Sequence, residues 1–120
     1  MTKRAVRRFN SELLAAREAQ NTGDVAKMQH HYECALEFRD HAGVRQNLGA
    51  LAQLRGDTDM AKRHYRRAIQ LDPKSSRSHS NLGGIYRAEG EKALARKHYT
   101  LAMRDPSNVV DAGARRDGRG

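Results

Sequence analysis

The sequence has 120 residues, a hydrophobic fraction of 38%, 5% aromatic residues and a formal net charge of +9. A chain of this length buries one modest core, and a core made of Ala, Leu and a few Tyr favours packed helices over a β-sandwich. No apolar run approaches the roughly 18 residues of a membrane-spanning helix, and no apolar stretch follows the basic N-terminus, so neither a span nor a secretory signal is expected. The positive charge favours an acidic partner, which a protein, a nucleic acid or an anionic membrane can supply.

A His-Tyr pair occurs three times along the chain, and much of the surrounding sequence repeats with it. Leu48-Gly49 in one copy corresponds to Leu82-Gly83 in the next, and Gly56 corresponds to Gly90. A fixed period of about 34 residues is typical of stacked helix pairs. We therefore predict three copies of one helix pair, at residues 8–41, 42–75 and 76–107.

The first copy is the weakest, because only its second helix follows the pattern closely. Its lone cysteine, Cys34, cannot form an internal disulfide, which indicates a reducing and hence cytoplasmic location. His30 stands one helical turn before Cys34, and His41 is a possible third metal ligand. No second Cys/His pair completes a tetrahedral site, so we expect a surface histidine and a half-buried cysteine rather than a metal centre.

The second copy shows the predicted pair most clearly. An apolar stripe that contains Leu48 and Leu51 ends at Gly56, where a left-handed residue closes the helix, and Asp57 is placed to cap the next one. The second helix ends before Pro73. Its buried stripe is expected at helical spacing and consists of Ala61, Tyr65, Ala68 and Ile69. Gly49 and Ala61 are small because the two helices are expected to cross closely there.

The third copy follows a Ser-rich segment, Lys74–Asn81, that offers caps to its first helix. After it, residues 108–120 form a Gly/Arg-rich tail that we expect to be flexible. No full capping helix is evident. The last helix pair is therefore expected to expose an apolar edge, through which the chain can self-associate or dock onto a partner.

These copies resemble the tetratricopeptide repeat, whose pattern places Leu-Gly, an aromatic, Ala, an aromatic, Ala and Pro at fixed positions. Ala52 departs from it, because an aromatic is usual there, and in the first copy Leu14-Ala15 stands for Leu-Gly. The resemblance covers residues 8–107. It implies an all-α fold, a right-handed α-solenoid of three helix pairs over residues 1–107, and a non-enzymatic adaptor for protein–protein interaction.

Asn47 and Asn81 each precede a Leu-Gly pair and occupy the same position in successive copies. In tetratricopeptide folds this position faces a concave groove, and the arrangement is similar to the asparagine ladder with which O-linked N-acetylglucosamine transferases grip an extended peptide. The alternative is that both are ordinary solvated polar residues. The residues predicted to bind a peptide or a partner helix in the groove are Asn47, Asn81, Gln46, Gln53, Arg77 and Arg87.

A second candidate surface is a basic stripe on the second helices. We predict that these cations share the outer, convex face with His64 and His98. A solvated face is one interpretation of the stripe, and binding to an acidic protein or to nucleic acid is the other. Its members are Lys62, Arg63, Arg66, Arg67, Arg96 and Lys97.

The three repeated histidines, His31, His64 and His98, are predicted to be structural or surface residues. Equivalent residues on neighbouring helix pairs lie about 10 Å apart, too far to share one metal ion. No nucleophile, base and orienting group can be assembled from the sequence. We therefore expect no enzymatic activity, no metal and no cofactor.

Overall fold

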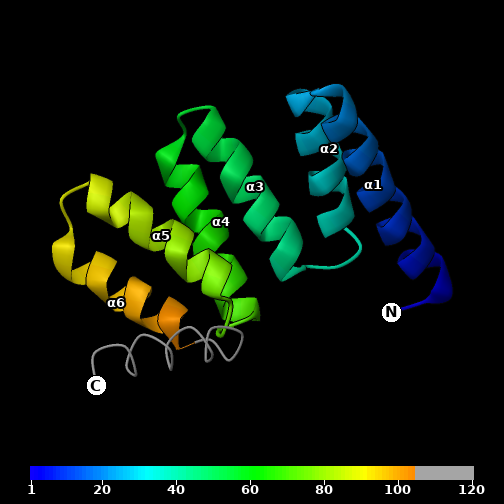
Figure 1. The fold of residues 1–120 in the computed structure, drawn as a ribbon. Helices are drawn as coiled ribbons and strands as arrows, with labels where there is room; N and C mark the ends of the chain where they lie inside the picture. The colour runs from blue at the N-terminus through cyan, green and yellow to red at the C-terminus, as the bar shows by residue number, and fades with distance from the viewer. Residues whose placement is uncertain (105–120) are drawn as a thin grey trace, which may run out of the picture. The chain divides into compact units, whose positions relative to one another are not determined.

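The computed structural model describes residues 1–104, which form six α-helices and no strand. The helices are α1 (Lys3–Thr22), α2 (Val25–Leu36), α3 (Ala42–Leu54), α4 (Thr58–Leu71), α5 (Ser76–Ala88) and α6 (Lys92–Met103) (Figure 1). They divide into two compact units, and the boundary falls inside α4, after His64. Pro106 and the predicted flexible tail lie outside the described residues.

The core of the first unit (residues 1–64) is built by α1, α2 and α3. The helices α1 and α2 pack side by side and are joined at Gly23, whose φ of 75° closes α1 in the left-handed conformation (Figure 1). The side chain of Asp24 then caps α2 by accepting from the backbone N–H of Lys27 (3.1 Å). The buried side chains of this core are Phe9, Ala16, Tyr32, Ala35, Val44, Leu48 and Leu51.

The turn between α3 and α4 confirms the prediction made from its sequence. Gly56 has φ of 79°, and the side chain of Asp57 accepts a hydrogen bond from the backbone N–H of Met60 (3.1 Å). In α4 the stripe expected to be buried is buried at Ala61, Tyr65 and Ala68, whereas Ile69 remains half-exposed. The small residue at position 61 is fully covered, as expected at a helix crossing.

The second unit contains the end of α4 together with α5 and α6, which lie side by side (Figure 1). Ser75 caps α5 by accepting from the backbone N–H of Ser78 (3.2 Å), as the Ser-rich segment predicts. A Cβ atom added at Gly83 would lie 3.1 Å from the Tyr99 ring and 3.4 Å from the Ala95 carbonyl oxygen. This close approach explains why the first helix of the third copy carries glycine after Leu82.

The first copy has a different register from the one predicted. Leu14 is 57% exposed, whereas Ala16 is completely buried. Ala16 is therefore the counterpart of the buried Gly49, so Ala15-Ala16 takes the place of Leu-Gly, and the alignment of Leu14-Ala15 is wrong by one position. The reason is the buried face of α1, which runs through Phe9, Ala16 and Ala19 at helical spacing and leaves position 14 outside.

Candidate partner-binding surfaces

Each repeated histidine contacts the side chain that lies 19 residues earlier, on the preceding helix. His31 Nδ1 is 2.8 Å from Glu12, His64 Nδ1 is 3.3 Å from the Arg45 guanidinium, and His98 Nδ1 is 3.0 Å from His79 Nδ1. All three histidines are half-buried. They join the two helices of a pair, which confirms a structural role and corrects the prediction that His64 and His98 share an outer face with the cations.

The same position therefore meets three different chemical partners. Burial, and then the Arg45 charge, lower the pKa of His64, and burial followed by His79 lowers the pKa of His98. His79 Nε2 lies 2.9 Å from the Pro73 carbonyl oxygen, to which it donates, so its Nδ1 accepts from His98. Glu12 instead offers His31 a carboxylate, and protonation of that ring forms an ion pair.

Cys34, His30 and His41 each make a contact within the fold. Cys34 Sγ lies 3.6 Å from His30 Nε2, while His41 caps α3 by accepting from the backbone N–H of Gly43 (3.0 Å). Burial, then the nearby Glu12 charge, raise the pKa of the Cys34 thiol, which disfavours the reactive thiolate. Within residues 1–104, no three His, Cys, Asp or Glu residues are grouped closely enough to hold a metal ion.

The residues predicted for the groove lie on the first helices of their pairs. Asn47, Gln46 and Gln53 are on α3, and Arg77, Asn81 and Arg87 are on α5. Asn47 and Asn81 are both half-buried, and neither side chain makes a hydrogen bond within residues 1–104. Arg77 and Asn81 are one helical turn apart, so they share one face of α5, whereas Arg87 lies about a third of a turn away from Asn81.

The register of α1 places Leu14 at the position that Asn47 and Asn81 occupy in the other copies. Its exposed side chain makes this position apolar in the first helix pair. Two amides and one leucine therefore occupy the three equivalent positions.

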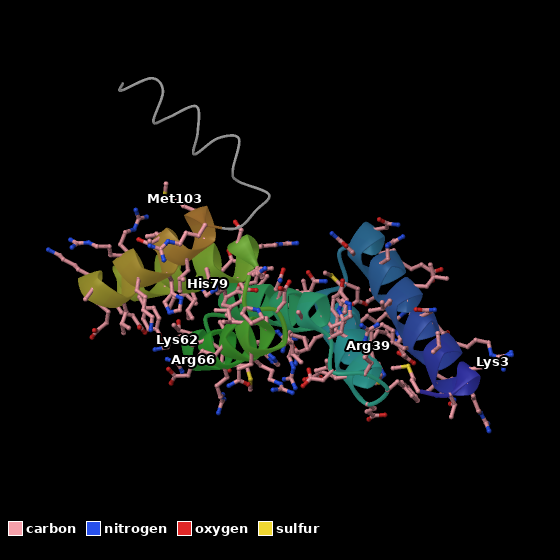
Figure 2. All side chains as sticks on the ribbon, turned by 90° about the horizontal axis from the view of Figure 1, so that it is seen from below. Lys3, Arg39, Lys62, Arg66, His79 and Met103 are labelled. Carbon is pink, nitrogen blue, oxygen red and sulfur yellow. The ribbon has the colours of Figure 1, made fainter. Side chains whose placement is uncertain are left out.

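The predicted basic stripe is only partly open to solvent. On α4 (Lys62 and Arg66 are labelled in Figure 2) the side chain of Lys62 is 16% exposed and lies 3.9 Å from Asp59. Arg66 donates to the Tyr86 hydroxyl (2.7 Å), and its guanidinium carbon lies 5.9 Å from the centre of that ring. The contact holds Arg66 toward α5. The exposed members of the stripe are Arg63, Arg66, Arg96 and Lys97, and the half-buried ones are Lys62 and Arg67.

One cleft of about 480 Å³ brings together residues predicted for different surfaces. Arg87, predicted for the groove, and Arg96, predicted for the stripe, both line it. The other lining side chains come from α6 and include Lys92, Tyr99 and Met103. The last helix pair thus exposes an apolar surface bordered by cations, which includes the exposed Met103. Leu94 of α6 is also exposed but does not line the cleft.

None of the helices within residues 1–104 combines the length and the apolar character that crossing a membrane requires.

Comparison with known proteins identifies the repeat. The tetratricopeptide repeat family model matches residues 42–75. The crystal structure of MamA is similar with a TM-score of 0.77 at 16% identity, over 86% of this chain and 61% of that one. A variant of the Thermobaculum terrenum O-GlcNAc transferase is similar with a TM-score of 0.77 at 28% identity, over 90% of this chain and 21% of the transferase chain.

The chain therefore spans less than two thirds of either of these structures. No curated protein matches the sequence. The matched residues 42–75 comprise α3, the glycine turn and α4, which is the pair predicted from the second copy. Residues 42–75 thus match a tetratricopeptide repeat, and the chain has an all-α solenoid fold.

Proposed function

We propose that this protein is a non-enzymatic adaptor that binds an extended peptide or a partner helix in a concave groove on the first helices of its repeats. Tetratricopeptide repeats are protein-interaction modules, which supports the general class. The observation that carries the specific proposal is the pair Asn47 and Asn81, which stand at equivalent positions of first helices and make no side-chain hydrogen bond within residues 1–104.

The chemistry of an asparagine side chain suits this task. Its amide donates and accepts at the same time, so it matches a peptide group without reading the side chain that the peptide carries. Asn is a mediocre helix former, so its occurrence at two equivalent helical positions favours a function. Around them, Gln46 and Gln53 add polar contacts, and Arg77 and Arg87 select a partner with acidic side chains.

The test begins with mass spectrometry of the proteins that co-purify with the chain, followed by calorimetry with the partner so identified. Each hydrogen bond contributes about 0.5–1.5 kcal/mol, so Asn47→Ala with Asn81→Ala should weaken binding by about 1–3 kcal/mol. The melting temperature should stay unchanged, because neither side chain belongs to the buried core. Unchanged affinity would move the binding surface elsewhere, and lost stability would make both amides structural.

A basic nucleic-acid-binding module is the second candidate function, and the net charge of +9 is the observation that favours it. Its surface would be the exposed cations of α4 and α6: Arg63, Arg66, Arg96 and Lys97. An acidic protein would use the same charges, and the cation-bordered cleft of the last helix pair offers a place for it or for a second copy of the chain.

We also propose a cytoplasmic location, because a single cysteine cannot form an internal disulfide and suits a reducing compartment.

A further inference from the structure

A partly enclosed cleft of about 80 Å³ lies in the first unit, between α2, α3 and the start of α4. Leu48 and Ala52 are its buried floor, and Met60 and His64 are half-buried beside them. The remaining lining residues are polar and come from α2 and from the end of α3 and the turn after it: Gln29, Glu33, Arg55 and Asp57. The cleft is found where Ala52 replaces the aromatic residue that the repeat usually carries.

The third helix pair shows the same place filled. Tyr86 is the counterpart of Ala52 in the third copy, and its ring stacks on His98 with centroids 5.6 Å apart and an interplanar angle of 24°. The Tyr86 hydroxyl accepts from Arg66 (2.7 Å). His98 is the counterpart of His64, and Arg66 is the counterpart of Glu33 one copy earlier. The second unit thus contains a phenol ring in a site whose counterpart in the first unit lacks one.

The cleft has the size and the lining to hold the phenol ring that Tyr86 carries and Ala52 lacks. Tyr and Ala differ by a phenol ring, and the cleft has an apolar floor for the ring face and the His64 imidazole as the stacking surface. The Arg45 guanidinium lies 3.3 Å from His64 Nδ1 and so fixes the position of that imidazole. Where the filled site has a guanidinium that donates to the phenol oxygen, the open one has the Glu33 carboxylate, which accepts.

We propose that this cleft binds the side chain of a tyrosine from a partner protein, with the ring stacked on His64 and the hydroxyl donating to Glu33. The four tyrosines of the chain are all built into its own helices, at positions 32, 65, 86 and 99, so the occupant comes from another molecule. The cleft contains none of the residues proposed for the peptide groove. Its occupancy is therefore testable independently of the groove.

The probe is p-cresol, which is the tyrosine side chain itself, titrated into the intact protein and followed by NMR. We expect saturable shifts of the Met60 methyl and His64 ring resonances. Ala52→Tyr fills the cleft from within and should abolish these shifts while circular dichroism shows the helical fold intact. Absence of shifts at Met60 and His64 in the wild type would overturn the proposal, as would shifts that persist in the filled variant.

A second pair of variants keeps the test decisive if Ala52→Tyr does not fold. Glu33→Ala removes the proposed acceptor and should weaken p-cresol binding about 3- to 10-fold, the effect of one hydrogen bond, while toluene binding is unchanged. Glu37→Ala is the matched control, because Glu37 is an exposed acidic residue one turn further along the chain and does not line the cleft. Equal effects of the two variants, or equal affinity for p-cresol and toluene, would contradict recognition of the hydroxyl by Glu33.

Discussion

At the scale of single residues, one position of the repeat performs the same packing task with different chemistry. The histidine of each His-Tyr pair reaches a side chain of the preceding helix, which is Glu12, Arg45 or His79. Glu12 presents a carboxylate to its histidine, whereas Arg45 and His79 present nitrogen groups to theirs. The other two contacts, and the cap formed by His41, use rings that the fold keeps neutral, so part of the packing depends on pH.

This dependence gives a prediction with a definite sign. Burial, as the first cause, lowers the pKa of His41, His64 and His98 below the ordinary value of 6.5. A histidine with a lowered pKa binds fewer protons in the folded chain than in the unfolded chain, so its contribution is complete above pH 6.5 and is lost as the pH falls below it. We expect a melting temperature that is constant above about pH 7 and declines toward about pH 5.

Thermal melts followed by circular dichroism across this range test the prediction. His64→Gln and His98→Gln should flatten the decline, since each removes one ring whose protonation opposes folding. A melting temperature that stays constant or rises as the pH falls from about 7 to 5 would contradict the prediction.

At the scale of helices, the sequence predicts those features that depend on local backbone chemistry. The turn at Gly56, the Asp57 cap and the Ser75 cap all follow from residues whose conformations or hydrogen bonds are specific. The register of α1 was predicted wrongly, because its alanines repeat so densely that Ala15 and Ala16 both fit a small-residue position. The buried Phe9 was not predicted, since nothing in the later copies corresponds to it.

The functional surfaces, too, could be predicted only in part from the sequence. Asn47 and Asn81 are found because identical residues recur at one position of the repeat. The contacts of the repeated histidines were not predicted. Their partners are a carboxylate, a guanidinium and an imidazole, which stand at the same spacing along the chain but share no chemical type. The sequence indicates the cleft at Ala52 only through the absence of an aromatic residue there. Its lining cannot be read from the sequence, because the residues come from three helices.

Two adjacent glycines of α5 provide a prediction about helix packing. A Cβ at Gly83 would meet the Tyr99 ring at 3.1 Å, whereas one at Gly84 would lie 3.7 Å from the Tyr99 hydroxyl, an ordinary contact. Alanine is a better helix former than glycine by about 0.5–1 kcal/mol, so Gly84→Ala should stabilise the chain by about this amount. Gly83→Ala should be less stable than Gly84→Ala by about 1–2 kcal/mol in urea melts. Equal stability of the two variants would mean that α5 and α6 do not approach closely at Gly83.

The small residues of the second helices give a related prediction. Ala61 is completely buried and Ala95 nearly so. Replacing either by Leu should overpack the adjoining helix and lower the free energy of unfolding by about 1–3 kcal/mol in denaturant melts. Ala93→Leu, at an exposed position of the same helix as Ala95, is the control and should change the stability little. Neutral results at both buried positions would contradict the close crossing.

At the scale of the whole molecule, the net charge separates the two candidate functions. We expect the cations to select an acidic protein, and therefore expect no shift of DNA or RNA in gels at low salt. Binding to duplex DNA would instead show a log–log salt slope of about −0.9 for each phosphate contacted. If such binding were found and were abolished when Arg63, Arg66, Arg96 and Lys97 were changed to Glu, the nucleic-acid alternative would replace the adaptor proposal.

The central claim is that a partner binds on the first helices through the two asparagine amides. An NMR titration of the ¹⁵N-labelled protein with its co-purifying partner tests this directly, because the side-chain NH₂ groups of Asn47 and Asn81 give their own signals. We predict that both signals shift and saturate together with backbone signals of α3 and α5. Saturable shifts confined to α4 and α6, with both asparagine signals unmoved, would contradict the claim.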